Sequence, residues 1–249
     1  MSTVAIFGGS GRLGSAIVRC VARQCRTRFA YHSKADEAAR IVAELRAQGR
    51  DVEASRVDVR NPQEVDDFLR VTAEGDGELT GVISANGAGF PPGPFYEVEE
   101  AEFRRIVEVD VFGTFHVMKS ATRLLGMRGG GSIVVLLTAA VLRSAIFDGM
   151  SAVPKAAVAG MIRQLARDAG PLNVRCNGIA PGVVDTDKVA DIEALPAYAQ
   201  RLVKAFVTDT PVGRFNSPET IAALAAFLVS DVAADISGQI IGADGGYSA

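Results

Sequence analysis

VAIFGGSGRLGSAIV, at residues 4–18, is the stretch that decides the fold. Its first four residues form a continuous apolar run, as expected of a parallel strand that is buried on both faces. After the glycines, apolar residues return at the i, i+3, i+4 spacing of an amphipathic helix, beginning with Leu13, Ala16 and Ile17. The stretch therefore predicts a strand, a glycine-rich turn and a helix in immediate succession.

The turn has the residue types of a phosphate-binding loop. Its glycines allow a tight turn, the approach of a pyrophosphate to bare backbone, and close packing of helix on strand. An anion there would lie at the N-terminus of the helix, against unpaired N–H groups and the positive end of the helix dipole. We expect a dinucleotide at this loop, although an ordinary strand-to-helix turn would use the same residues. The candidate binding residues are Gly8, Ser10, Gly11, Arg12, Leu13 and Gly14.

The composition bounds the class of protein. With 249 residues, 48% of them hydrophobic, and no linker, the chain is predicted to form a single domain over residues 1–249. The net charge is -3 and Lys and Arg form no stripe, so nucleic acid and anionic membrane are not expected as partners. The three cysteines show no CxxC pattern, which argues against a disulfide framework and against a metal site. Because a strand begins within three residues of the N-terminus and no apolar run is long enough to span a membrane, we expect a soluble, cytoplasmic protein.

Strand and helix patterns alternate along the rest of the chain, which predicts an α/β fold. A helix is expected to follow Ser33 as its cap, another to begin at Asn61 and Pro62, and a third to have Pro154 in its first turn. The loop at about residues 182–211, with a short helix in it, is a candidate substrate loop or lid. Further strands are predicted at residues 29–32, 52–59, 79–84, 132–138, 173–179 and 238–243.

The end of the second strand bears on the choice of cofactor. A carboxylate there usually binds the ribose hydroxyls of NAD, whereas basic groups suit the additional phosphate of NADP. Here the chain has Tyr31, His32, Ser33 and Lys34, with Arg12 in the phosphate loop and no acid. This pattern favours NADP(H) over NAD(H). The alternative is that His32 and Lys34 are solvated loop residues.

Several motifs together resemble the short-chain dehydrogenase/reductase family, and the resemblance covers essentially the whole chain. They are the glycine loop, Asp58, SANG at residues 84–87, Lys155 followed by AAVAG, NVRCNGIAPG at residues 173–182, and the ending SGQIIGADGGY. The resemblance implies a Rossmann-type, doubly wound, seven-stranded parallel sheet in three layers, with strand order 3-2-1-4-5-6-7. It also implies an oxidoreductase acting on the carbonyl or hydroxyl group of a small-molecule substrate. The cofactor-binding positions that it adds are Asp58, Val59, Asn86, Gly87, Lys155, Pro181, Gly182, Val184 and Thr186.

The catalytic positions depart from the family pattern of Ser, Tyr, Lys and Asn. By resemblance the Lys is Lys155, the Ser position falls on Thr138, and the Asn position falls on Asp110. The Tyr position falls on Ser151, or on Met150 if the register slips by one residue around Pro154. The loop departs as well, because the family's middle glycine falls on Arg12 and the triplet follows a GxxGxxG spacing.

The missing tyrosine leaves two hypotheses. A serine hydroxyl is a far weaker acid than a phenol whose pKa is lowered by a neighbouring Lys, so losing the acid should cost a factor of about 10² to 10⁴ in rate. Asp110 could replace it if burial raised its pKa, or could form an ion pair with Lys155 in a disused site. The protein is therefore an NADP-dependent oxidoreductase with a rebuilt proton path, or a non-redox member of the fold. The second hypothesis includes a lyase, a cyclase and a catalytically silent subunit that partners an active relative.

Assembly is the last expectation. The apolar residues of the two long helices, including Phe112, Phe115, Val117, Val158 and Ile162, are more than one face of a sheet would be expected to cover. We therefore expect a homodimer or homotetramer that associates through these helices, as the family resemblance also implies. A hetero-oligomer with an active relative is the alternative.

Overall fold

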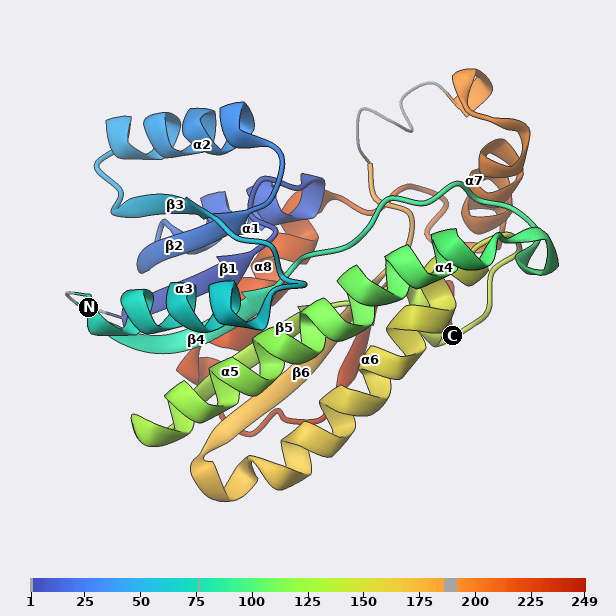
Figure 1. Ribbon diagram of the computed structural model, residues 1–249. Helices are drawn as coiled ribbons and strands as arrows, with labels where there is room; N and C mark the ends of the chain where they lie inside the picture. Colours follow the sequence, from blue (N-terminus) through green and yellow to red (C-terminus); the bar gives the residue numbers. More distant parts are fainter. Residues whose placement is uncertain (1, 76, 186–191) are drawn as a thin grey trace.

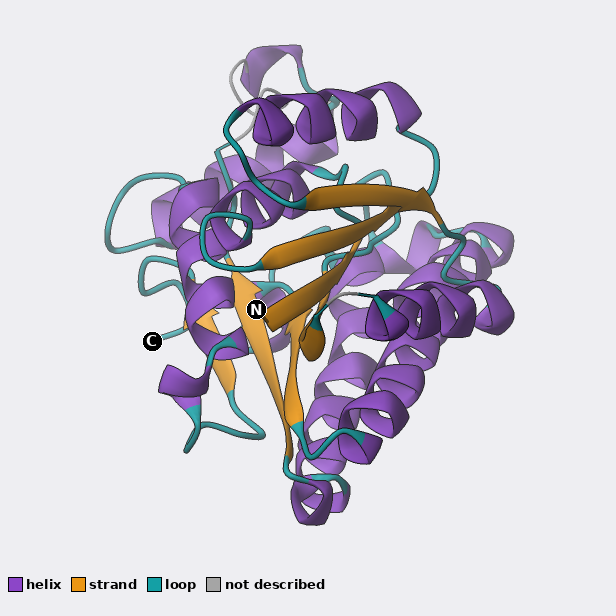
Figure 2. Cartoon of the chain, turned by 90° about the vertical axis from the view of Figure 1, so that its left-hand side faces the viewer, coloured by secondary structure: helices purple, strands orange, loops and turns teal. Residues whose placement is uncertain are grey.

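Seven parallel strands form one twisted sheet, and helices cover both of its faces (Figures 1 and 2). The strand order is β3-β2-β1-β4-β5-β6-β7, which confirms the predicted fold class and strand order. The computed structural model describes residues 2–75, 77–185 and 192–249. The strands are β1 (Ser2–Phe7), β2 (Arg26–Tyr31), β3 (Val52–Arg56), β4 (Glu78–Ser84), β5 (Gly131–Leu136), β6 (Val174–Pro181) and β7 (Ile240–Ala243).

Helices connect the strands and lie on both faces of the sheet (Figure 1). The α-helices are α1 (Arg12–Val21), α2 (Ala35–Ala47), α3 (Pro62–Glu74), α4 (Glu100–Val107), α5 (Gly113–Met127), α6 (Gly149–Asp168), α7 (Ala197–Asp209) and α8 (Pro218–Val229). A π-helical turn, η2 (Glu108–Phe112), joins α4 to α5. Short 3₁₀ turns are η1 (Phe95–Glu97), η3 (Ala139–Val141), η4 (Gly170–Leu172), η5 (Ile192–Ala194) and η6 (Asp231–Ala233). Among the described residues, no helix is both long enough and apolar enough to cross a bilayer.

The core is divided by the sheet into two apolar layers. On one face α1, α2 and α8 pack their apolar sides, with Ile17, Ile41 and Ile221 fully buried (Figure 1). On the other face α3, α5 and α6 do the same, with Leu69 and Leu125 fully buried. Side chains of one strand therefore meet a helix layer whichever way they point, which explains the unbroken apolar runs of the sequence.

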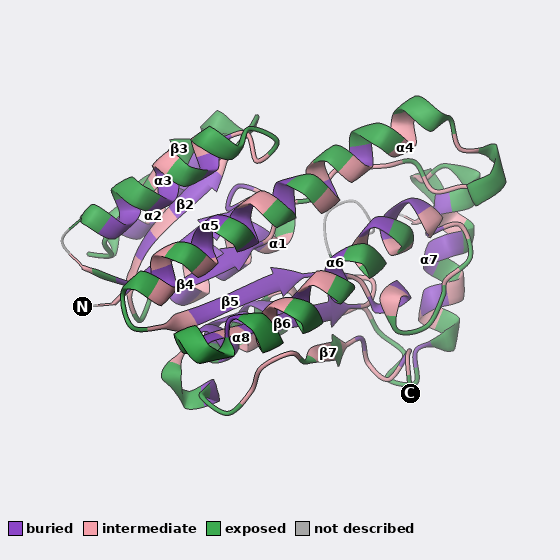
Figure 3. Cartoon of the chain, turned by 60° about the horizontal axis from the view of Figure 1, so that its bottom comes forward, coloured by how far each residue is buried: buried purple, intermediate pink, exposed green. Residues whose placement is uncertain are grey.

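The strand of the opening stretch has the predicted environment. Val4 is 2% exposed, and Ala5, Ile6 and Phe7 are completely buried. Strands β5 and β6 are similarly enclosed, whereas the outer sides of α4, α5 and α6 face solvent (Figure 3).

Three local predictions were wrong or displaced. Pro154 lies in the second turn of α6, not in the first, because the helix begins at Gly149. Its ring removes one N–H from the helix ladder, so the carbonyl of Met150 loses its usual partner four residues on, yet α6 continues to Asp168. Ser33 does not cap α2; Lys34 holds the cap position, without a side-chain hydrogen bond. The third strand ends at Arg56, so Asp58 and Val59 lie beyond it.

A smaller apolar cluster lies beyond the carboxyl ends of β5 and β6. Leu202 and Phe206 of α7 pack there against Ala139 and Tyr247. The segment predicted as a substrate loop thus contains a helix of 13 residues that is anchored to the domain by its own apolar side.

Candidate functional site

The glycine loop has a geometry that other residues could not adopt. Gly8 has φ +77°, and a Cβ there would lie 2.6 Å from the carbonyl oxygen of Ala85. A Cβ on Gly14 would overlap the carbonyl oxygen of Gly8. The backbone N–H of Gly11 donates to the same carbonyl at 2.9 Å, which closes the turn. Glycine is therefore required at positions 8 and 14 by the turn and by the contact of helix on strand.

The N-terminus of α1 suits an anion. Gly11 is its N-cap residue, no side chain caps the helix, and its first turn has no acidic residue. The first-turn N–H groups are thus not bonded within the helix, and the positive end of its dipole lies at the bare loop. These features fit the pyrophosphate of a dinucleotide. Ser10 is buried in the loop and Arg12 is exposed at the helix start, so Arg12 at the family's glycine position does not fill the cradle.

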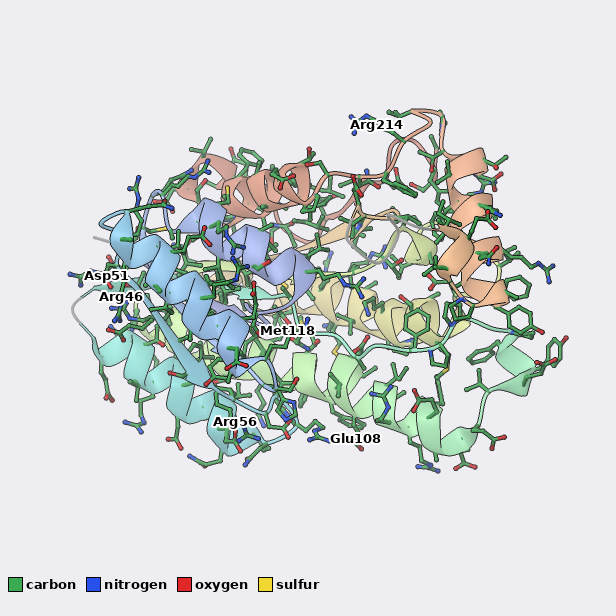
Figure 4. The ribbon with its side chains drawn as sticks, turned by 90° about the horizontal axis from the view of Figure 1, so that it is seen from above. Arg46, Asp51, Arg56, Glu108, Met118 and Arg214 are labelled. Carbon is green, nitrogen blue, oxygen red and sulfur yellow. The ribbon has the colours of Figure 1, made fainter. Side chains whose placement is uncertain are left out.

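Basic side chains surround the acid that follows β3. Arg60 binds the Asp58 carboxylate through Nε and Nη2 at 2.6 to 3.1 Å, and His32 Nε2 lies 3.6 Å from it. The Arg60 guanidinium lowers the pKa of Asp58 to about 2. Arg56, which the sequence analysis did not single out, is paired in register with Tyr31 and marks the end of β3 opposite Arg46 and Asp51 (Figure 4). Its position in the register could be found only once the strands were paired.

The exposed loop after β2 completes this basic region. His32, Ser33 and Lys34 are all solvent-exposed at the carboxyl end of the strand. His32 lies beside Asp58, as Arg60 does, and the Glu64 carboxylate accepts the Asp58 backbone N–H at 2.8 Å. A negatively charged group at this edge would meet the exposed His32 and Lys34 side chains and the Arg60 guanidinium, which is paired with Asp58.

The segment after β4 is bonded to the π-turn. Asn86 donates through Nδ2 to the Val109 carbonyl at 3.3 Å and to Thr114 Oγ1 at 3.2 Å, while its Oδ1 accepts from Ser84 Oγ. Gly87 lies next to Asp110 and Lys155: a Cβ on Gly87 would be 3.9 Å from Asp110 Oδ1 and 3.9 Å from Lys155 Nζ. The side chain of Asn86 thus holds the strand end in place.

Asp110 and Lys155 form a buried ion pair. Asp110, in the π-turn, is 3% exposed, and its Oδ2 lies 2.5 Å from Lys155 Nζ. Its Oδ1 accepts the backbone N–H of Ala88 at 2.7 Å. Both carboxylate oxygens therefore have partners, and Asp110 joins Lys155 to the segment after β4.

The helical register brings Ser151 rather than Met150 to Lys155. Because α6 runs without interruption through Pro154, residues 151 and 155 lie one turn apart on one face. Ser151 is 7% exposed, while Met150 is 2% exposed and belongs to the apolar interior. The register of α6 therefore favours Ser151 over the one-residue slip to Met150 for the Tyr position.

Thr138 lies at the end of β5, on the same edge of the sheet. Its side chain accepts the backbone N–H of Ala140 at 3.3 Å and caps the short turn η3. The hydroxyl hydrogen remains available for donation to a substrate oxygen.

The chain after β6 is held by a distant segment. Pro181 ends the strand, and a Cβ on Gly182 would lie 2.6 Å from Asn216 Oδ1. Val184 forms a parallel bridge with Asn216. Thr186, also predicted to bind the cofactor, lies outside the described residues.

Val59 and Gly113 are in close contact at the other end of the π-turn. A Cβ on Gly113 would lie 2.6 Å from Val59 Cγ2, and His116 Nδ1 is 2.9 Å from the Val59 carbonyl oxygen. Val59 thus fixes α5 against the segment that follows β3. The structure thereby brings the described candidate residues to one edge of the sheet, the carboxyl ends of its parallel strands, where ligands of open α/β sheets bind.

Asp148 is a further acid of this region that was not among the predicted site residues. It is 5% exposed and precedes Ser151 by three residues, at the start of α6. Burial raises the pKa of its carboxyl to about 7, against a smaller opposite effect of Lys155. The sequence does show an acid seven residues before Lys155, which is a helical spacing. The burial of the Asp148 carboxyl, however, depends on tertiary structure and has no signal in the sequence.

Comparison with known proteins agrees with this architecture. Residues 12–248 match the family model described as "Enoyl-(Acyl carrier protein) reductase". The chain is 31% identical over 241 residues to 7alpha-hydroxysteroid dehydrogenase of Escherichia coli (strain K12), covering 97% of this chain and 92% of that protein. It is 30% identical to cis-4-hydroxycyclohexanecarboxylate dehydrogenase of Sinomonas cyclohexanicum, covering 98% of this chain and 95% of that protein.

Solved structures of short-chain dehydrogenases have the same fold. A short-chain type dehydrogenase/reductase from Mycobacterium ulcerans has a TM-score of 0.90 at 30% identity, over 99% of this chain and 90% of that one. A 7alpha-hydroxysteroid dehydrogenase complexed with NADH and 7-oxo glycochenodeoxycholic acid has a TM-score of 0.86 at 29% identity, over 98% and 93%.

Proposed function

Because the chain belongs to the short-chain dehydrogenase/reductase family, we propose that it is an NADP(H)-dependent oxidoreductase of a small-molecule carbonyl or hydroxyl group. One observation carries the proposal: Lys155 is held beside Gly87, at the same sheet edge as the glycine loop. The bound dinucleotide would supply hydride chemistry. The relatives named as dehydrogenases of hydroxylated rings make a cyclic alcohol or ketone the substrate class to test first.

The chain's own residues have distinct roles in this proposal. Gly8, Gly11 and Gly14 leave backbone free for the pyrophosphate, and Asn86 holds the loop after β4. Lys155 keeps a positive charge near the reacting groups, while Asp110 positions it. Thr138 offers a hydroxyl to the substrate oxygen.

Further cofactor contacts are proposed for Ser10, Arg12, Leu13, Ser33, Val59, Pro181, Gly182, Val184 and Thr186. The domain is proposed as one unit, residues 1–249, with residues 182–211 as its substrate loop.

The preference for NADP(H) is supported by the basic region after β2 and β3. Arg60 binds Asp58 and His32 Nε2 lies 3.6 Å from it, while Lys34 is exposed in the loop after β2; basic groups at these strand ends suit an additional phosphate on the ribose. Calorimetric titration with NADPH and NADH tests this, with Lys34→Glu as the variant and Lys119→Glu, remote from this loop, as its control. We expect tighter binding of NADPH and a reversed preference only in Lys34→Glu. Equal affinity of the wild type for both cofactors would refute the preference.

A non-redox function is the second candidate, because Ser151 stands at the position of the family's acid. Steady-state rates with NADPH and a panel of cyclic and open-chain ketones separate the two. Ser151→Tyr should raise a weak activity by a factor of about 10² or more if only the acid is missing. Met150→Tyr, at a buried apolar position, should not. If the wild type, Ser151→Tyr and Met150→Tyr all bind NADPH and none of them reduces a ketone, the non-redox function is favoured and a partner subunit should be sought.

A further inference from the structure

Asp148 is a buried carboxyl group without a structural task. It is the N-cap residue of α6, but its side chain makes no capping hydrogen bond, although Asp is among the best capping residues. Its backbone carbonyl instead accepts the N–H groups of Ser151 and Ala152. Among the described residues the Asp148 carboxyl accepts no hydrogen bond, and its oxygens are not among the fully buried polar atoms without a partner, so they are not sealed from solvent. Burying an acid in this way is unfavourable, so a role other than capping explains it better.

The position of Asp148 is on the face of α6 that the candidate site uses. Ser151 and Lys155 follow it by three and seven residues, which is the spacing of neighbours along one side of a helix. The Lys155 ammonium is close enough to oppose the rise in the pKa of Asp148. Asp148 is therefore the acid that precedes the family's Tyr position by one helical turn.

The backbone before Asp148 is held in an unusual conformation. Phe147 has φ +61°, which is rare for a bulky side chain and is retained where the surroundings determine it. Its ring lies 4.9 Å from that of Tyr198 and 4.6 Å from the Arg201 guanidinium, and its carbonyl accepts the Gly93 N–H at 3.1 Å. Two segments that flank the strand ends, α7 and the loop after β4, thus fix where Asp148 lies.

The other acidic groups nearby are less suited to releasing a proton. Asp110 is bonded through both oxygens, and a serine hydroxyl such as that of Ser151 is a very weak acid. Tyr247, which faces Asp148 from the C-terminal segment, donates its hydroxyl to the Ser144 carbonyl at 3.1 Å, and burial raises its pKa. The charged groups around Tyr247 are Arg143, Asp209 and Asp244.

We propose that the Asp148 carboxyl is the proton donor of carbonyl reduction in this protein, in place of the phenol that the family has at the position of Ser151. The carbonyl carbon receives a hydride from the reduced nicotinamide, the electrons of the C=O π bond move to oxygen, and that oxygen takes the proton of Asp148. The products are the alcohol, the oxidised cofactor and the Asp148 carboxylate, which regains a proton from solvent. This inference rests on the proposed oxidoreductase function.

The test compares Asp148→Asn with the wild type, with Asp168→Asn at the far end of α6 as a matched control. Ketone reduction with NADPH is followed from pH 5 to 9, and NADPH affinity is measured by fluorescence titration. We expect Asp148→Asn to lower kcat by a factor of about 10² to 10⁴ with unchanged NADPH affinity, and Asp168→Asn to be normal. The wild-type rate should fall above about pH 7, where Asp148 loses its proton.

Two further measurements make the result decisive. Carbon-13 NMR spectra of aspartate-labelled protein without cofactor are compared between the wild type and Asp148→Asn. The wild type should show one carboxyl signal that titrates near pH 7 and that is absent from the variant. Asp148→Glu should retain part of the activity and its pH dependence. Full activity of a folded Asp148→Asn, or a carboxyl that titrates near pH 4, would overturn the donor role alone. A wild type that binds NADPH but reduces no ketone would overturn the proposed function, and the donor role with it.

Discussion

Replacing Asp148 by Asn should change how stability depends on pH, independently of any activity. In the folded protein the carboxyl has a pKa of about 7, against an ordinary value of 3.8, because burial disfavours its charged form. Between these values the folded state holds a proton that the unfolded chain has released. The contribution of this group to stability is therefore complete below about pH 4 and is lost as the pH rises to about 7.

The magnitude follows from the size of the shift. About three pKa units at 1.36 kcal/mol each correspond to about 4 kcal/mol in the free energy of unfolding. Asn has a similar shape and does not titrate. The stability of Asp148→Asn relative to the wild type should thus rise by up to about 4 kcal/mol from pH 4 to pH 7.5.

Urea unfolding followed by circular dichroism measures this difference at several pH values. Asp168→Asn, whose carboxylate is exposed, serves as the control and should follow the wild type. A difference between Asp148→Asn and the wild type that stays constant across the range would refute the reasoning, because it would mean that Asp148 titrates alike in the folded and unfolded chains.

Three other expectations follow from the site and the surface. Gly14→Ala forces a Cβ against the loop, which costs about 1–3 kcal/mol of strain, so calorimetry should show that NADPH binds about tenfold more weakly or worse. Gly170→Ala is the control and should bind NADPH normally, because a Cβ at that position meets no atom within 4 Å. Asp110→Asn leaves the Lys155 ammonium without its counter-charge and should lower the free energy of unfolding by about 3 kcal/mol in urea titrations; an unchanged midpoint would contradict the importance of the pair. Light scattering should give a mass at least twice the 26.1 kDa of the chain, with a monomer at micromolar concentration counting against oligomerisation.

The surface that motivates the last expectation differs in part from the one inferred from the sequence. Val117, Val158 and Ile162 are almost completely buried within the domain itself, so they cannot contribute to an interface. Phe112 and Phe115, at 47% and 43% exposed, are available for one. Apolar periodicity alone does not distinguish a helix side that covers its own sheet from a side that covers a second subunit.

The order of strands and helices was predictable because it depends on local patterns. The continuous apolar runs and the Asn61 cap have their signals within a few residues, and the Asn61 side chain accepts the expected backbone N–H group, that of Gln63. The glycine loop was also predictable, because Gly8 and Gly14 are needed by the backbone itself.

The charge partners in the candidate site were harder to predict because they come from distant segments. Asp110 pairs with Lys155 across 45 residues, which made an ion pair one of two alternatives rather than a conclusion. The buried state of Asp148 depends on packing around the start of α6, for which the sequence has no local signal. Pro154 misled the prediction of the helix start, since proline is commonest in a first turn but is tolerated here in the second.

The π-turn between α4 and α5 makes this region sensitive to changes in chain length. A π-turn spaces its hydrogen bonds five residues apart, so it contains more residues than the α-helical path it replaces. Deleting one residue here would let α4 and α5 join as one regular helix. The side chains outside the turn would keep their directions, because the wider turn takes up the additional residue locally, whereas side chains within the turn would change theirs. Asp110 would then turn away from Lys155, and Ala88 would lose its acceptor. Insertions and deletions that a surface loop would accept are therefore expected to be excluded from this part of the helix, even though no residue type would have changed.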